Sequence, residues 1–343
     1  MQATLEQKYR TMTEAPVRGL IVKLAIPTMI SMLVTSFYNM ADTFFVGKLG
    51  PSATGAVGVV YSVMAVIQAV GFFFGHGSGN YISRELGKKS YETASQMAAT
   101  GFISALATGL LICILGQIFL EPLAIFLGST QTILPYTIAY LKVILLGAPW
   151  MCASFVLNNQ LRFQGSASYA MVGIVTGALL NIALDPLLMF ALDLGVAGAG
   201  WATILSQLVS FCLLLAGTRR GGNIRLKLRN FRFSGFYFSW IVKGGLPSLG
   251  RQGLASVATI CLNLAAKGYG DAAIAAMSVV QRIAMFGASA MIGFGQGFQP
   301  VCGFNYGAGL CSRVRKGFWF CVKVSTAALL VIAALGYGFA PKL

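Results

Sequence analysis

Two carboxylates lie well inside hydrophobic stretches of the chain, and they are the residues whose types and spacing best suit chemistry. They are Asp42 and Asp185, and the other seven acidic residues lie near the ends of such stretches or outside them. Tyr38 precedes Asp42 by four residues and Asn181 precedes Asp185 by four, so each pair shares one face of a helix. A charge near the centre of a membrane helix costs ~2.5 to 3.5 kcal/mol on insertion scales. These residues therefore predict a functional polar site.

Helical depth predicts that further polar side chains join these carboxylates. Asp42 and Asp185 each lie eight residues from the polar turn that ends their stretch, which is about 12 Å at 1.5 Å per residue. Thr203 and Tyr140 lie at the same depth in two other stretches. Tyr38 and Asn181 lie one turn deeper. We therefore expect these six residues to form one polar group.

Two kinds of ion fit such a group. A low dielectric and a second carboxylate nearby both favour binding of a proton. Carboxylate, amide and hydroxyl oxygens together also suit a small hard cation such as Na⁺. The alternative is a purely structural hydrogen-bonded network, which is less favoured because Asn or Ser would connect helices at lower cost.

Prolines and arginines inside the hydrophobic stretches suggest further roles. Pro27 and Pro186 are expected to act as hinges, because a proline removes a helical hydrogen bond and bends the rod. Arg251 and Arg282 are cations in the second half of the chain. Two interpretations stay open for them: contact with substrate or with the other half across a cavity, or binding to backbone carbonyls and lipid phosphate.

Composition requires a membrane. The chain has 343 residues, 57% of them hydrophobic and 10% charged, with a mean hydropathy of +0.76, which is too apolar for a soluble domain of this length. We predict an all-α polytopic protein, since each hydrophobic stretch is near or above the ~20 residues that a spanning helix needs. The nine expected spans are 17–48, 53–83, 93–119, 132–161, 168–192, 196–217, 238–266, 272–303 and 314–339.

The net charge of +16 predicts orientation and not nucleic-acid binding. Lys and Arg gather before the first span and after each even-numbered one, densest in 219–232, whereas the alternate loops carry few. The amino terminus and the even loops are therefore expected in the cytoplasm, with no cleavable signal.

The chain repeats itself with an offset of 220 residues. Ile21-Val22-Lys23 and Pro27 align with Ile241-Val242-Lys243 and Pro247. Because one copy holds six spans, both copies enter the membrane in the same orientation, as parallel repeats. We expect a cytoplasmic segment 1–16, a six-helix N-lobe 17–218, a basic linker 219–237 and a partial C-lobe 238–343 with three of six helices. Two full copies would end near residue 440, so we expect the chain to be a fragment or a truncated gene product.

Sequence motifs for enzymatic chemistry are absent. Gly87-Lys88-Lys89-Ser90 lacks the earlier glycine of a nucleotide-binding phosphate loop, and His76 is the one histidine, too few for a triad or a histidine metal site. We therefore predict no enzyme, no cofactor and no nucleotide partner, and energy drawn from an ion gradient of H⁺ or Na⁺.

Several motifs, in order, resemble the multidrug and toxic compound extrusion (MATE) family. They are Lys23-Leu24-Ala25-Ile26-Pro27, Asn39-Met40-Ala41-Asp42, Val46-Gly47-Lys48-Leu49-Gly50, Leu161-Arg162-Phe163-Gln164-Gly165, Leu180-Asn181, Asp185-Pro186, the run Gly195 to Thr203, Gly295 to Pro300, and Asn305-Tyr306-Gly307.

The resemblance implies a two-lobed, cation-coupled exporter of drug-like molecules in the plasma membrane. In the bacterial branch that the chain resembles most, the coupling positions fall on Asp42, Asn181, Asp185 and Thr203, with Tyr38 and Tyr140 in supporting roles. The chain departs from the family pattern in having three helices fewer, and it has no acid in its seventh span, where another branch has one. The alternatives are a flippase for a lipid-linked saccharide, which Arg251 and Arg282 would serve, and a non-transporting membrane scaffold.

Overall fold

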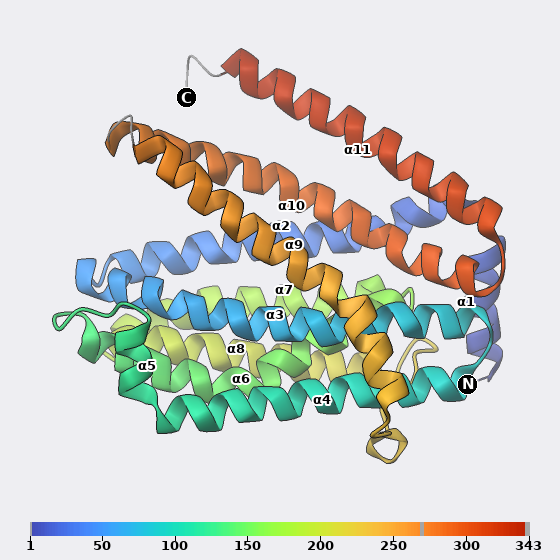
Figure 1. Cartoon of the computed structure of the whole chain (residues 1–343), viewed down its shortest axis with the longest axis horizontal. Coiled ribbons are helices and arrows are strands. Elements are labelled where there is room, and N and C mark those ends of the chain that lie inside the picture. The colour runs from blue at the N-terminus through green and yellow to red at the C-terminus, as the bar shows by residue number, and fades with distance from the viewer. Residues whose placement is uncertain (1, 268–270, 340–343) are drawn as a thin grey trace.

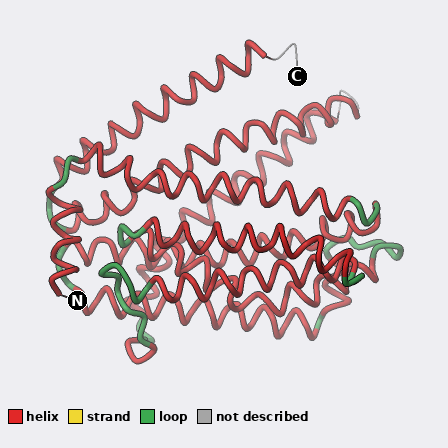
Figure 2. The backbone as a smooth tube through the Cα atoms, turned by 180° about the vertical axis from the view of Figure 1, so that it is seen from behind, coloured by secondary structure: helices red, strands yellow, loops and turns green. Residues whose placement is uncertain are grey.

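The protein is a bundle of long helices (Figures 1 and 2). The computed structural model describes residues 2–267 and 271–339. Within these ranges the elements are α1 (Gln2–Glu14), α2 (Val17–Gly47), α3 (Pro51–Gly87), α4 (Tyr91–Ile118), α5 (Leu120–Phe126), α6 (Leu134–Phe163), α7 (Ala167–Pro186), η1 (Leu187–Ala191), α8 (Gly195–Gly217), η2 (Leu228–Asn230), α9 (Gly235–Lys267), α10 (Asp271–Gly307) and α11 (Cys311–Phe339).

The predicted all-α fold is confirmed, and a helix stands at each of the nine expected spans. Seven segments of the described chain are long and apolar enough to cross a membrane: α2, α3, α4, α6, α7 with η1, α8 and α11. The other two expected spans are the long helices α9 and α10. Two short helices, α1 and α5, were not predicted, because neither carries the long apolar run that marks a span.

Helix boundaries follow the 220-residue offset. The helices α3 and α10 begin 220 residues apart, at Pro51 and Asp271, and they end 220 residues apart, at Gly87 and Gly307. The helices α4 and α11 also begin with this offset, at Tyr91 and Cys311. The internal repeat in the sequence is therefore a repeat of helices. We call α2 to α8 the N-lobe and α9 to α11 the C-lobe.

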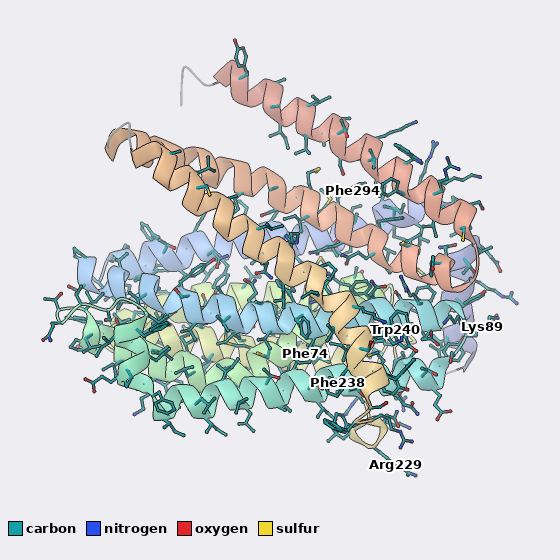
Figure 3. All side chains as sticks on the ribbon, in the orientation of Figure 1. Phe74, Lys89, Arg229, Phe238, Trp240 and Phe294 are labelled. Carbon is teal, nitrogen blue, oxygen red and sulfur yellow. The ribbon has the colours of Figure 1, made fainter. Side chains whose placement is uncertain are left out.

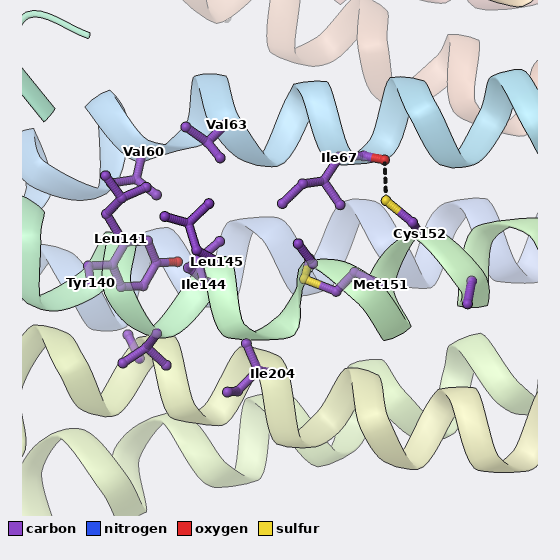
Figure 4. Close-up of a cluster of buried hydrophobic side chains, with 14 of the residues drawn as sticks. Val60, Val63, Ile67, Tyr140, Leu141, Ile144, Leu145, Met151, Cys152 and Ile204 are labelled. Carbon is purple, nitrogen blue, oxygen red and sulfur yellow. Dashed lines mark hydrogen bonds between the residues drawn. The ribbon is translucent and has the colours of Figure 1, made fainter. Parts of the chain in front are cut away.

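The N-lobe is organised around α6, whose middle is buried among α3, α4 and α8. Figure 4 shows the side chains of α6 between those of α3 and α8. Its core includes Val60 and Ile67 of α3, Leu141 and Ile144 of α6, and Ile204 of α8, each at most 2% exposed. The Cys152 thiol of α6 donates to the Ile67 carbonyl of α3 at 3.6 Å. This packing holds α6 and α8 in place behind the polar side chains of the site.

The two lobes meet at one end of the bundle. This end, which we call the basic end, holds α1, the α3–α4 turn with Lys89, and the α8–α9 linker with Arg229 (Figure 3). A second apolar cluster joins the lobes there, with Ile21 of α2, Ile82 of α3 and Phe304 of α10 among its buried members. Toward the opposite end, where α5 lies, the helices of the C-lobe diverge from the N-lobe (Figures 1 and 2).

Glycines allow the lobes to approach so closely at the basic end. A Cβ on Gly77 of α3 would stand 2.3 Å from the Ile241 carbonyl oxygen of α9, and one on Gly297 of α10 would stand 2.6 Å from the Ala25 backbone of α2. The Thr28 hydroxyl of α2 donates to the Gly293 carbonyl of α10 at 2.6 Å. The contact between the lobes is thus largely backbone against backbone.

Candidate functional site

Helix α7 presents its polar residues on a face of small side chains. Gly173, Gly177, Asn181 and Asp185 recur at a spacing of four and are buried. A Cβ on Gly177 would stand 3.0 Å from the Ser210 side chain of α8, so α7 and α8 pack closely. Asn181 and Asp185 are therefore held against α8, 1% and 0% exposed.

The predicted hinge at Pro186 coincides with a change of helix type. The α-helix ends at Pro186, and a π-helical turn, η1, continues to Ala191. A π turn fits a proline here because the proline lacks the amide hydrogen of an α-helical bond. Pro27 lies inside α2, which continues unbroken to Gly47. Whether either proline moves during function stays a prediction.

The Asn181 amide connects α7 with α8. With its amide oriented to satisfy both neighbours, Asn181 donates to Asp185 Oδ2 at 3.1 Å and accepts from the Thr203 backbone N–H at 3.2 Å. The Thr203 hydroxyl donates to the Ala199 carbonyl one turn back, at 3.0 Å.

Helices α2 and α6 complete the group. Asp42 of α2 is partly buried, and its carboxylate lies near enough to Asp185 to repel it. The hydroxyl groups of Tyr38 (α2) and Tyr140 (α6) both approach that of Thr203, and the Tyr140 hydroxyl also contacts Met64 Sδ at 3.9 Å. The structure thus brings together all six polar residues of the predicted group. We call Tyr38, Asp42, Tyr140, Asn181, Asp185 and Thr203 the carboxylate cluster.

Two oxygens of the carboxylate cluster lack a partner. Asp42 Oδ1 and Asp185 Oδ1 are both buried, and neither accepts a hydrogen bond from any residue that the structure describes. A buried polar atom without a partner costs about 1 to 3 kcal/mol, and more when it is charged. Two carboxylates that repel each other and lack donors can relieve this cost by taking up a proton or a small cation between them.

Of the two arginines for which a place in the cavity was one interpretation, the structure describes the side chain of Arg251 alone, and Arg251 is not a member of the carboxylate cluster. Arg251 of α9 has an exposed side chain and interacts electrostatically with His76 of α3. Arg282 belongs to α10, but its side chain lies outside the described residues.

A buried arginine that the sequence analysis did not single out connects the lobes. Arg162 of α6 is 3% exposed and donates to Asn159 Oδ1 at 2.9 Å within its own helix. Across the lobe boundary it donates to Gln296 Oε1 at 2.6 Å and Gln299 Oε1 at 3.4 Å, both on α10. In the sequence, Arg162, Gln296 and Gln299 are visible only as parts of the motifs Leu161 to Gly165 and Gly295 to Pro300. The sequence did offer a signal for this contact: an arginine at the end of one span and two glutamines inside another. A buried cation needs polar partners, and glutamine side chains can supply them.

Comparison with known proteins identifies the family. The MatE family model matches residues 27–187 and 247–343. The multidrug export protein MepA of Staphylococcus saprophyticus is 31% identical over 303 residues, which are 88% of this chain and 67% of the relative. MepA of Staphylococcus aureus is 29% identical over 299 residues, which are 85% of this chain and 65% of the relative. The chain spans about two thirds of the length of these relatives.

Solved structures show the same arrangement. A crystal structure of MATE in the straight conformation superimposes with a TM-score of 0.91 at 31% identity and covers 97% of this chain and 75% of its own. An outward-facing multidrug resistance transporter of the MATE family superimposes with a TM-score of 0.90 at 31% identity, covering 98% and 74%. Taken with the helical repeat and the carboxylate cluster, these matches show that the chain belongs to the MatE family, whose members are multi-pass membrane transporters and not enzymes.

Proposed function

We propose that the protein is a cation-coupled antiporter of the plasma membrane that exports lipophilic, cationic drugs or toxic metabolites by alternating access of its two lobes. The names of its relatives support the substrate class, since MepA is a multidrug export protein in two staphylococcal species. The coupling ion, H⁺ or Na⁺, binds at the carboxylate cluster.

The observation that carries this proposal is the pair of unpartnered carboxylate oxygens, Asp42 Oδ1 and Asp185 Oδ1. A structural network would pair both oxygens with donors, because satisfied polar groups are the less costly way to hold helices together. Here the Asn181 amide occupies only Oδ2 of Asp185. The free oxygens leave room for an ion whose arrival and departure change the charge of the site.

The lobes supply the movement that the ion controls. If the basic end faces the cytoplasm, as its Lys and Arg content favours, the lobes are closed on the inside and divergent on the outside. An ion that enters from outside neutralises the carboxylate cluster and binds the two conformations with different affinity. This difference favours release of the drug outward and reopening of the basic end toward the cytoplasm.

The energy of one ion is sufficient for export. One monovalent charge that crosses 100 mV carries ~2.3 kcal/mol. At ~1.4 kcal/mol for each tenfold concentration ratio, this sustains roughly a fortyfold drug gradient. Export therefore needs no nucleotide.

Efflux of a fluorescent cation from vesicles tests the proposal. Vesicles that contain the full chain are loaded with ethidium, and an inward gradient of H⁺ or of Na⁺ is imposed separately. We expect one gradient to accelerate efflux, and Asp42→Asn and Asp185→Asn to abolish that acceleration, because each variant keeps the side-chain shape and removes the charge. The effective gradient identifies the ion.

Asp193→Asn is the matched control. Asp193 is an exposed acid eight residues after Asp185, with a φ of 51° that Asn tolerates well. It should export like the parent. Gradient-driven efflux that survives in both cluster variants would refute coupling at the carboxylate cluster, and a parent chain without gradient-driven efflux would refute antiport by this chain.

The flippase alternative has less support. It calls for cations in the buried transport site, whereas Arg251 is exposed and the carboxylate cluster is dominated by two acids.

A further inference from the structure

A small cavity lies where α9 crosses α3 near the basic end, outside the carboxylate cluster. Its volume is about 130 Å³, and it is lined by Asn80, Tyr81 and Arg84 of α3, by Trp240 and Lys243 of α9, and by one glycine from each helix. Figure 3 places Trp240 on α9 at this crossing, toward the end that carries Lys89. The cavity therefore joins the N-lobe to the C-lobe.

The crossing itself explains the cavity. The helices touch at Gly77 and Gly244, where a Cβ on Gly244 would stand 3.0 Å from the Gly77 Cα. Because α3 and α9 cross at this contact, they diverge on either side of it, and the neighbouring side chains do not fill the space between them. Polar and aromatic side chains line the space that is left.

Two cations line the cavity without a carboxylate. The Arg84 guanidinium lies 6.0 Å from the centre of the Trp240 ring and 4.7 Å from that of Tyr306, and Lys243 Nζ lies 5.5 Å from the Trp240 ring. Neither cation forms a salt bridge with any described residue. The neighbouring acid, Glu85, is paired with Lys88 at 2.8 Å.

This chemistry selects an anion. Arginine and lysine are the usual phosphate ligands, and Asn80 and Tyr81 add an amide and a hydroxyl that can donate to phosphate oxygens. The cavity is smaller than the roughly 300 to 1,000 Å³ of a drug-sized site, so it suits a head group and not a transported drug.

The position favours a lipid as the source of the phosphate. Arg84 lies three residues, or about 4.5 Å of helix, before the end of α3, close to the depth of the head groups. Tyr and Trp beside it are the residues that gather at a membrane interface. Basic pockets between transmembrane helices on the cytoplasmic side are typical sites for anionic head groups.

We propose that this cavity binds the phosphate of an anionic phospholipid. Arg84 and Lys243 hold the phosphate from the two lobes, and Trp240 packs beside the head group. Because the ligands come from both lobes, the bound lipid favours the conformation in which the basic end is closed. This inference does not depend on antiport or on the identity of the coupling ion.

Native mass spectrometry of the full chain in detergent tests the site. The protein is titrated with phosphatidylglycerol or phosphatidylcholine, and the occupancy of the tightest lipid site is measured. We expect one phosphatidylglycerol to bind well before further copies do. Lys243→Gln should weaken it about tenfold, the loss of one hydrogen bond to a charged group. Arg84→Gln should have a similar effect, and Arg84→Lys a smaller one.

Arg229→Gln is the charge-matched control, since Arg229 lies in the exposed linker after α8 and outside the cavity. It should bind phosphatidylglycerol like the parent. Lys243 is exposed, so Lys243→Gln should fold normally. Its lipid binding can then be compared with that of the parent in preparations of equal monodispersity. Equal weakening by Lys243→Gln and Arg229→Gln, or equal binding of the two lipids, would overturn the proposal.

Soluble anions distinguish the source of the phosphate. Inorganic phosphate and glycerol 3-phosphate are added as competitors to the phosphatidylglycerol complex. We expect millimolar amounts of either to leave the lipid in place, because neither brings acyl chains to the protein. Displacement at lipid-like concentrations would overturn the assignment to a lipid and indicate a site for free phosphate esters.

Discussion

Replacing Gly77 by alanine should push the lobes apart at the basic end. Gly77 lies in α3, and a Cβ there would stand 2.3 Å from the carbonyl oxygen and 2.8 Å from the Cα of Ile241 in α9. Both atoms belong to the backbone, so no rotation of a side chain can relieve the contact. The added methyl group can be accommodated only if α9 moves away from α3.

The size of the effect follows from two opposing contributions. Alanine in place of glycine favours a helix by up to about 1 kcal/mol, wherever along the helix it lies. Overpacking of a tight contact costs typically 1 to 3 kcal/mol. Compared with a glycine replacement that makes no contact, Gly77→Ala should therefore shift the equilibrium away from the closed basic end by about fivefold to a hundredfold.

Gly58→Ala is that comparison. Gly58 lies in the same helix, and a Cβ there would meet nothing within 4 Å. It has the same gain in helix propensity without the clash. The difference between the two variants isolates the contact between the lobes.

Spin-label distances measure the shift. Labels at Glu92→Cys in the N-lobe and Lys316→Cys in the C-lobe, both exposed positions near the basic end, report the separation by double electron–electron resonance in a background without native cysteines. Gly77→Ala should enlarge the population at long distance, and Gly58→Ala should match the parent. Identical distance distributions for the two variants would refute a backbone contact between α3 and α9 in the working molecule.

Two further predictions concern polar contacts of the basic end. Burial lowers the pKa of Lys8 in α1 to about 7, although its ammonium donates to Ser166 Oγ at 2.8 Å and Asn223 Oδ1 at 2.6 Å. Since the docked helix holds fewer protons than the free one between pH 7 and 10.5, docking of α1 should strengthen as pH rises through this window and weaken as pH falls toward 7. NMR of the reductively ¹³C-methylated chain, with Lys8→Arg for assignment, should show one lysine titrating near pH 7, and titration of every lysine above pH 10 would contradict burial. Arg162→Met should open the basic end about tenfold or more, because it removes the charge-assisted bond to Gln296. The same spin-label pair should lengthen, Arg162→Lys should fall between parent and Arg162→Met, and an unchanged distance in Arg162→Met would show that the lobes close without this arginine.

Hydropathy and periodicity determined most of the architecture in advance. A membrane helix must satisfy its own backbone and present apolar side chains, so each span is visible as a continuous run, and the nine expected spans all stand as helices. The 220-residue offset was visible because both copies keep glycines and prolines where helices end or bend, and the boundaries of α3 and α10 follow it. The carboxylate cluster was predictable because acidic residues inside apolar stretches are rare, and Asp42 and Asp185 are such residues. Depth along the helices then predicted the polar residues beside them.

Only the tertiary structure decided how the lobes meet. The contact of Arg162 with Gln296 joins residues 134 positions apart, and no helical period or depth count relates them. The cavity at the crossing of α3 and α9 likewise depends on the angle between two helices, which two glycines permit but do not specify. Local sequence determines where a helix runs and which of its residues are costly to bury. The partners that relieve this cost lie on other helices. They are therefore determined by how the helices pack, including where the backbone of one lobe touches that of the other.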